Sequence, residues 1–529
     1  MTVAVSYEEW RARVEQELRG APFDSLVSTL RGGIEIQPLY HERPWGGGED
    51  PRGRPGAAPF VRGARPAGEA GGWLRCTRIG GGDPEAAKEA LAADLRGGCD
   101  AAWLELDVRP RRQDELLTAV RERMVRGAEA GAEGIPIDSP EALAVLIAGV
   151  DLERVALFLD AGAGSPTAAA FAFQTLRLRA ADRERARLFL GIDPIGALAA
   201  AGARAEPLEE REAEMAGFAV HCAAELPHSR AVTVSALPWH EAGATPAQEL
   251  GWTAATLVRY LRRMVEEALD VLEAAEQVTF RIAVGRDLFL GIAKLRALRW
   301  LWTKVLAAGG VAAPPPPFVH AVSSDLALTR RDPWTNLLRV TTEVFAAVAG
   351  GADAITAAAY DRLLRSADEP AGSRLGRRLA RNAQHVLSEE AHLGRVADPA
   401  GGSYYLETLT EELARAAWRE MRRVEAAGGI AEHVRSGRLR EEAETAWRER
   451  RAALVDGSDT VLGVSVYAPP DGEGAEEPEA AVGGRRHPAR GRGIVAGVLE
   501  PLPRHRLAEP FEDDGVAPPA GARTAEEPA

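Results

Sequence analysis

The chain has 529 residues, of which 46% are hydrophobic and 27% are charged, and its formal net charge is -14 with a pI near 5.4. This composition is that of an ordinary globular protein with enough apolar material for a large core, and it excludes disorder over most of the chain. The acidic balance argues against a general nucleic-acid binder and against attraction to an anionic membrane surface.

Three cysteines, Cys76, Cys99 and Cys222, are an odd number with no CxxC spacing. We interpret them as reduced thiols, which predicts a cytoplasmic protein without a disulfide framework or a zinc site. The N-terminus becomes charged within eight residues, and no run of 18 apolar residues occurs. The sequence therefore predicts no signal peptide and no membrane span.

The N-terminal segment 1–45 is predicted to be a helical arm. Ser6 and Glu9 form a capping box, and Tyr7 and Trp10 begin a helical spacing of apolar residues over 6–19. An exposed helix with two aromatic side chains needs a surface to pack against, either its own barrel or another chain.

A segment rich in glycine and proline, 46–72, follows the arm. Regular structure does not propagate through such a composition, and we interpret it as a linker between the arm and the main domain.

From residue 73 onward, short apolar runs alternate with longer helical patterns. Eight repeats of strand and helix, with strands that are apolar on both faces, favour an α/β fold, a closed (β/α)8 TIM barrel with an N-terminal arm. An open doubly wound sheet is the alternative, because a strand count does not prove closure. The eight predicted strands are 73–79, 101–107, 154–160, 186–192, 231–236, 278–284, 318–323 and 352–360.

Two further helices, over 372–396 and 409–429, are predicted to follow the barrel, which we assign to 73–467. The remaining segment, 468–529, is rich in proline, glycine and charge, and cannot bury enough apolar surface to fold alone. We interpret it as a linker and tail.

General catalytic motifs are absent: the sequence has no GxxxxGK[ST], no GxGxxG after a strand, no HExxH and no GxSxG. Long segments instead resemble the barrel subunits of methylmalonyl-CoA mutase, an adenosylcobalamin-dependent isomerase. These segments are 23–40, 238–250, 281–305, 331–361 and 381–418. The resemblance extends to about residue 467.

The family contains catalytic chains and a homologous small subunit that does no chemistry. In catalytic chains a tyrosine in TIRQYAGF lies between substrate and corrin, and the resemblance places Thr77 there. A histidine in SGYHMQEAGA binds the thioester carbonyl of the substrate, and the resemblance places Pro238 there. Proline offers no side-chain donor to polarise that carbonyl. His240 follows two positions later, where the family has glutamine. We interpret it as a structural histidine, with a role as a catalytic base as the weaker alternative.

The other candidate substrate-binding residues are interpreted as remnants of a substrate pocket at best. The loop after the seventh strand, with His320 and Ser323, is more apolar than the corresponding loop of catalytic chains. Arg286 and Asp287 stand at a strand end, where they form either a remnant of an acyl-CoA pocket or a local ion pair.

Catalytic chains also carry a C-terminal flavodoxin-like domain whose DxHxxG motif binds cobalamin. This motif does not occur here, and only 62 residues (529 minus 467) follow Tyr467. We therefore expect the cobalamin-binding domain to be missing, and we expect this chain to bind no cofactor and no metal.

The resemblance implies the small, non-catalytic subunit of a heterodimeric methylmalonyl-CoA mutase. The large catalytic subunit, its partner, would hold adenosylcobalamin and interconvert methylmalonyl-CoA and succinyl-CoA, and this chain would stabilise it. Tyr7, Trp10 and Tyr40 are candidate interface residues. Two alternatives stay open: an active acyl-CoA mutase whose cobalamin domain is a separate chain, and a stand-alone acyl-CoA binding protein.

Overall fold

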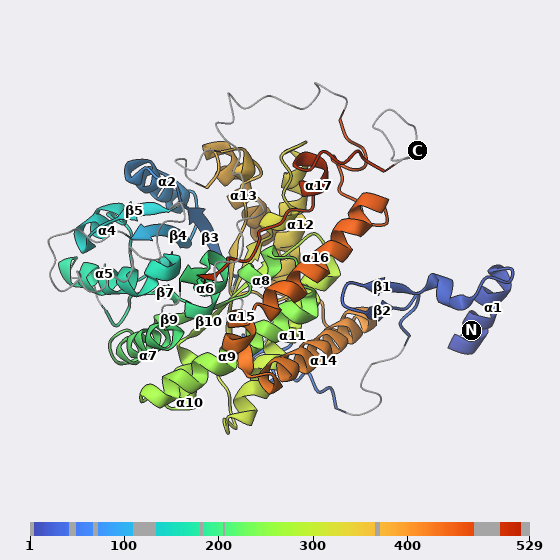
Figure 1. The fold of residues 1–529 in the computed structure, drawn as a ribbon, viewed down its shortest axis with the longest axis horizontal. Coiled ribbons are helices and arrows are strands. Elements are labelled where there is room, and N and C mark those ends of the chain that lie inside the picture. Colours follow the sequence, from blue (N-terminus) through green and yellow to red (C-terminus); the bar gives the residue numbers. More distant parts are fainter. Residues whose placement is uncertain are drawn as a thin grey trace.

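A computed structural model gives the fold and describes residues 5–41, 49–66, 72–108, 134–179, 183–204, 207–365, 371–469 and 498–519. Eight parallel strands form a closed ring, in which each strand pairs with the next in chain order and the last pairs with the first (Figure 1). This ring confirms the predicted barrel and excludes the open sheet. The strands are β3 (Leu74–Ile79), β4 (Ala101–Val108), β6 (Ala156–Asp160), β7 (Leu188–Ile192), β9 (Arg230–Ser235), β10 (Val278–Val284), β11 (Phe318–Ser323) and β12 (Ala354–Thr356).

Helices cover the outside of this ring (Figure 1). Strands that are buried on both faces need continuous apolar runs, and every residue of β10 is indeed buried. Side-chain caps start several helices: Asp83 caps α2, Thr245 caps α9 in a capping box with Gln248, and Asp287 caps α11. The helices are α2 (Pro84–Arg96), α4 (Pro140–Leu146), α5 (Ser165–Leu178), α6 (Pro194–Ala201), α7 (Leu208–Glu225), α8 (Leu237–Glu241), α9 (Pro246–Glu267), α10 (Val271–Glu276), α11 (Leu288–Ala308), α12 (Thr335–Ala349), α13 (Arg374–His385), α14 (Tyr404–Ala426), α15 (Gly429–Arg435) and α16 (Arg438–Asp456).

A further short strand, β5 (Ile135–Ile137), pairs in parallel with β4 outside the ring. The sequence analysis did not predict it, because a run of three residues is too short to show a period.

The N-terminal arm extends away from the barrel (Figure 1). Helix α1 (Tyr7–Glu17) begins at Ser6 with the capping box that the sequence predicted. A hairpin of β1 (Ser28–Leu30) and β2 (Ile34–Ile36) joins the arm to the body. Its turn is fixed to the barrel, because Arg31 donates from Nη2 to the carbonyl oxygen of Gly243 at 3.0 Å. The hairpin was not predicted.

Residues 49–66 contain no helix or strand, yet they are fastened to α11 and α14 by buried charges. Arg52 is completely buried, and its Nε lies 2.7 Å from Oε2 of Glu407. The same carboxylate receives Arg296 of α11 at 2.9 Å and Arg62 at 3.2 Å. Glu407 therefore joins the segment before the barrel to two helices behind it.

The described part of the C-terminal tail, residues 498–519, also packs on the barrel. Strand β13 (Val498–Leu499) pairs antiparallel with β8 (Ala203–Arg204), and a short helix, α17 (Glu509–Glu512), follows. Leu507 and Phe511 are buried in a cluster with Trp447 of α16. The tail is too polar to fold alone, and it acquires structure from the surface of the barrel and α16.

None of the helices in the described ranges is both long enough and apolar enough to cross a bilayer.

Replacing Glu407 by glutamine is expected to destabilise the protein by about 3–5 kcal/mol, because three arginines would lose a shared buried carboxylate. Chemical denaturation followed by tryptophan fluorescence measures the change. Glu441→Gln, on the exposed face of α16, is the matched control and is expected to cost less than about 0.5 kcal/mol. Equal stabilities for the two variants would contradict a structural role for the Glu407 cluster.

Candidate functional site at the strand ends

Enzymes with this fold use the carboxyl ends of the barrel strands, so the side chains there decide what the barrel can do. Here they pair with one another. Arg78, at the end of β3, lies 2.5 Å from Glu105 of β4 and 3.3 Å from Asp325, which follows β11. Arg362 also contacts Asp325, at 3.0 Å. Burial alone would raise the pKa of Glu105, but the charges of Arg78 and Arg362 lower it to about 2. These groups are therefore charged and mutually satisfied at neutral pH.

A second ion pair lies on the other side of the same opening. Arg281 of β10 contacts Asp160, the last residue of β6, at 2.5 Å. The guanidiniums of Arg281 and Arg78 both lie over the ring of Trp103, at 4.4 and 4.2 Å from its centroid. The indole Nε1 of Trp103 donates to Asp160 at 3.2 Å. Cation–π contacts and ion pairs thus connect the side chains at the strand ends into one network.

Below this charged layer, aromatic rings fill the inside of the barrel. Phe158 stacks on Phe189 at 4.2 Å between centroids, and Phe189 contacts Phe318 at 4.7 Å. His320 of β11 is fully buried, lies 4.5 Å from Phe158, and its Nε2 is 2.7 Å from the hydroxyl of Thr356. Burial and the nearby charge of Arg281 hold the pKa of His320 well below its ordinary value. The predicted site residue His320 is therefore a neutral core residue.

Thr77 lies on the outer side of β3. Its hydroxyl donates to Asp94 of α2 at 2.8 Å, and Asp94 also receives Arg377 and Arg381 of α13, at 3.1 and 2.7 Å. Because strand side chains alternate, Cys76 and Arg78 face the barrel interior and Thr77 faces the helices. The structure does not place Thr77 with the other site residues at the mouth of the barrel.

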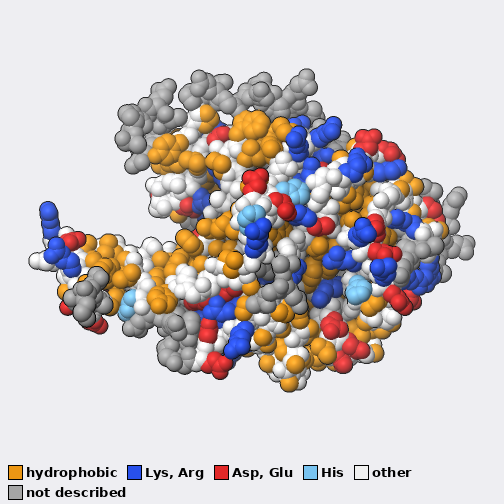
Figure 2. All heavy atoms as spheres, turned by 180° about the vertical axis from the view of Figure 1, so that it is seen from behind, with side chains coloured by type: hydrophobic (Ala, Val, Ile, Leu, Met, Phe, Trp, Pro, Cys, Tyr) orange, Lys and Arg blue, Asp and Glu red, His pale blue; other side chains and the backbone are white. Residues whose placement is uncertain are grey.

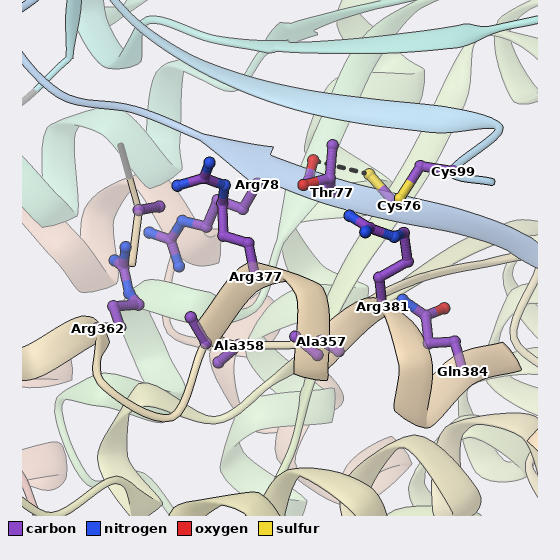
Figure 3. Close-up of a pocket in the computed structure, with 13 residues that line it drawn as sticks. Cys76, Thr77, Arg78, Cys99, Ala357, Ala358, Arg362, Arg377, Arg381 and Gln384 are labelled. Carbon is purple, nitrogen blue, oxygen red and sulfur yellow. Dashed lines mark hydrogen bonds between the residues drawn. The ribbon is translucent and has the colours of Figure 1, made fainter. Parts of the chain in front are cut away.

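A small cavity of about 20 Å³ lies beside Thr77, between β3 and α13 (Figure 3). Four arginines line this cavity, and each forms an ion pair with a carboxylate. Asp94 pairs with Arg377 and Arg381. The acidic groups at the strand ends pair with Arg78 and Arg362. Paired guanidiniums of this kind hold the helices to the barrel, and the cavity offers no free cation to a ligand.

Pro238 and His240 lie together in α8, the short helix after β9. Pro238 occupies the first turn, where a missing N–H costs no helical hydrogen bond. His240 is held at both ring nitrogens: Nδ1 is 3.1 Å from Glu249 and Nε2 is 2.7 Å from the hydroxyl of Ser324. Glu249 is held in turn by Lys294, at 2.8 Å.

This order of serine, histidine and glutamate is that of an activated nucleophile. Ser324, however, is 1% exposed. Ser323, its neighbour and a predicted site residue, is also buried, beside the carboxyl group of Glu343. Burial raises the pKa of Glu343 well above its ordinary value. The His240 side chain is 12% exposed, and the contacts of the cluster join α8, α9, α11 and the end of β11.

The tail covers the loops that carry these residues. The amide of Leu507 donates to the carbonyl oxygen of Leu326 at 2.9 Å, and the amide of His505 donates to Glu241 at 2.8 Å. The His505 ring stacks on Trp447 at 4.2 Å. A segment of the chain itself thus crosses the strand-end side of the barrel.

Sequence reasoning missed the charged layer and the tail contacts. The sequence did indicate charged side chains at the strand ends, because two predicted strands, 101–107 and 154–160, end in aspartate and the first contains Glu105. The tail gave no such signal, since its three buried apolar residues are diluted by charged ones.

The fold and the strand-end face define a parallel α/β barrel whose charged side chains at the strand ends are paired with one another. The family profile described as methylmalonyl-CoA mutase matches residues 29–483. The chain belongs to the methylmalonyl-CoA mutase family.

Three relatives illustrate the similarity. The chain is 38% identical over 471 residues to the methylmalonyl-CoA mutase small subunit of Streptomyces virginiae, covering 87% of this chain and 70% of the relative. It is 32% identical over 484 residues to the small subunit of Propionibacterium freudenreichii subsp. shermanii, covering 87% and 68%. It is 31% identical over 464 residues to the methylmalonyl-CoA mutase of Cereibacter sphaeroides, covering 87% of this chain and 64% of that one. The chain thus spans about two thirds of the length of these relatives.

Folding stability is expected to fall as the pH drops below about 6.5, because the unfolded chain takes up a proton at His320 near that pH and the folded chain does not. One such histidine contributes a slope of up to about 1.4 kcal/mol per pH unit. His320→Gln is expected to flatten the pH dependence of the unfolding free energy between pH 6.5 and 5, whatever its effect at pH 7.5.

His228→Gln, at an exposed position, is the matched control and is expected to keep the wild-type slope. If His320→Gln and the wild-type protein lose stability equally steeply in acid, His320 is not the buried neutral group described above.

Proposed function

We propose that this chain is the small, non-catalytic subunit of a heterodimeric methylmalonyl-CoA mutase, and that it stabilises a large catalytic subunit in the cytoplasm. The observation that carries the proposal is the network of ion pairs at the strand ends. Arg78 and Arg281 lie over Trp103 with their carboxylate partners, so substrate would have to displace paired charges and aromatic rings. The names of the small-subunit relatives support the same assignment.

The residues at this face do not fit a corrin ring. The tail segment around Leu507 covers the loops after β9 and β11, and the sequence has no DxHxxG motif to bind the cobalt from below. Pro238 also offers no donor to a thioester carbonyl. These features support an assignment of adenosylcobalamin, and of the isomerisation of methylmalonyl-CoA and succinyl-CoA, to the partner alone.

The arm supplies the surface that this proposal assigns to the partner. Trp10 contacts Phe23 edge-on at 6.1 Å, and Tyr7 stacks on His41 at 3.9 Å, but no residue of α1 is buried. At the base of the arm, Tyr40 contacts Tyr405 at 5.1 Å. Figure 2 shows hydrophobic side chains gathered along the arm and over the adjoining body. Aromatic side chains without burial in their own chain are well suited to an interface.

Direct assays distinguish this proposal from two alternative functions of the chain. Turnover by this chain as the only barrel, with adenosylcobalamin and a separate cobalamin-binding chain, would favour an active mutase. Tight acyl-CoA binding by the isolated chain, without association with a catalytic mutase chain, would favour a stand-alone binding protein.

Mixing the purified chain with a catalytic methylmalonyl-CoA mutase chain from the same organism is expected to give one heterodimer peak on size exclusion. Trp10→Ala is expected to weaken the complex by about 2 kcal/mol, roughly 30-fold in Kd, because aromatic side chains dominate interface energetics. Arg13→Ala, on the same helix with a 73% exposed side chain, is the control and is expected to change Kd less than about threefold. Two separate peaks on mixing the wild-type chains would refute the heterodimer.

A further inference from the structure

Three arginines from distant parts of the sequence lie beside α8, and within the described ranges the carboxylate of Asp459 is the one bonded to any of them. Arg31 is in the turn of the arm hairpin, Arg286 follows β10, and Arg450 is in α16. Their positions are linked through Gly243, whose carbonyl oxygen accepts from Arg31 at 3.0 Å. A Cβ atom added to Gly243 would lie 2.9 Å from the Cβ of Trp447, one helical turn before Arg450.

The hydrogen bonds of these arginines are unevenly distributed. Arg286 contacts Asp459 and the carbonyl oxygen of Thr460. Arg31 has only the Gly243 carbonyl, and Arg450 has no hydrogen bond and no ion pair within the described ranges. The Nε atom of Arg450 is nonetheless buried. Asp459 is thus the single carboxylate bonded to any of the three.

Further carboxylates lie near these arginines without bonding to them: Asp287 acts on Arg450, and Glu449 and Glu249 act on Arg31. Burial, together with the charges of Arg31 and Arg286, holds the pKa of Arg450 well below its ordinary value. Burial lowers the pKa of Arg31 to about 10, where Asp459 opposes the shift and Arg286 adds to it. An unpaired guanidinium removed from water is costly unless an anion completes its hydrogen bonds.

We propose that Arg31, Arg286 and Arg450 form a binding site for a small oxyanion of the phosphate class. Guanidinium groups present forked N–H donors that match the oxygens of phosphate, and three of them from three elements surround a compact anion better than an extended one. The buried Nε of Arg450 favours a ligand small enough to reach it. The site is separate from the ion pairs at the strand ends, and it does not depend on the proposed subunit function.

Bound phosphate would also tie the arm hairpin to α16 and to the end of β10. Occupancy of the site would therefore set how firmly the arm is held to the body.

The test is a titration of the full chain with inorganic phosphate at constant ionic strength, read by calorimetry and by the thermal midpoint, with chloride as the reference anion. Saturable binding of one phosphate is expected, with a rise in the midpoint that chloride does not give. Arg450→Gln and Arg31→Gln are each expected to weaken binding at least tenfold. Arg448→Gln removes the same charge from an exposed position of the same helix and is expected to leave binding unchanged.

A second readout separates ligand binding from a structural role. Without phosphate and at low salt, Arg450→Gln is expected to be at least as stable as the wild-type protein, because one of three repelling charges is gone. Titrations with pyrophosphate and adenosine monophosphate would show whether free or esterified phosphate is preferred. Equal effects of phosphate and chloride, or undiminished phosphate binding by both Arg450→Gln and Arg31→Gln, would overturn the proposal. Weaker binding to a second protein in those variants, with no phosphate binding by the wild type, would overturn it in favour of a partner's carboxylate.

Discussion

The contact of two guanidiniums with Trp103 sets the chemistry of the whole barrel. Arg78 and Arg281 lie over its ring, and each is neutralised by carboxylates at neighbouring strand ends, Glu105 and Asp160 among them. Removing one partner from a buried pair leaves an uncompensated charge, which costs more than the pair itself contributes. The strand ends are therefore interdependent, and a ligand that broke one pair would disturb the others. In this barrel charged side chains pair with one another at the strand ends, the place where most proteins of this fold do chemistry.

Much of the fold was predictable because a barrel repeats one local signal. All eight predicted strands are present, since strands buried on both faces need continuous apolar runs that stand out from the amphipathic helices between them. The resemblance assigned Thr77 to the position of the tyrosine of catalytic chains, but it did not say toward which side of the strand the side chain points. Strand alternation places Thr77 on the face opposite to Cys76 and Arg78, toward α2, and this could have been read from the sequence. A position that matches a catalytic residue in sequence thus carries no information about chemistry until its side-chain direction is known.

Composition was a weaker guide where a few residues anchor a long polar segment. Segment 46–72 was expected to be a linker, and segment 468–529 was expected to be a linker and tail that cannot fold alone. Arg52 in the first and Leu507 in the second are fully or almost fully buried. Averages over a window hide such residues, because one buried charge or one leucine is enough to fix a segment when its partner lies hundreds of positions away. Glu407 and Leu326, their respective partners, could not have been identified without the tertiary structure.

At α8 the segment after β9 is part of the scaffold. Where catalytic relatives are expected to have a histidine donor, Pro238 rigidifies the first turn, and His240 lies two residues later with both nitrogens engaged. Glu249 accepts from Nδ1, and Nε2 accepts from the Ser324 hydroxyl, which is the arrangement of a serine nucleophile with its base. Burial lowers the pKa of His240, which keeps the ring neutral and preserves this pattern at physiological pH. Ser324 is only 1% exposed, so its hydroxyl is not presented to a substrate, and these contacts join α8, α9 and the end of β11. The geometry of His240 therefore argues for a structural role and supports a function that depends on the surfaces of the barrel.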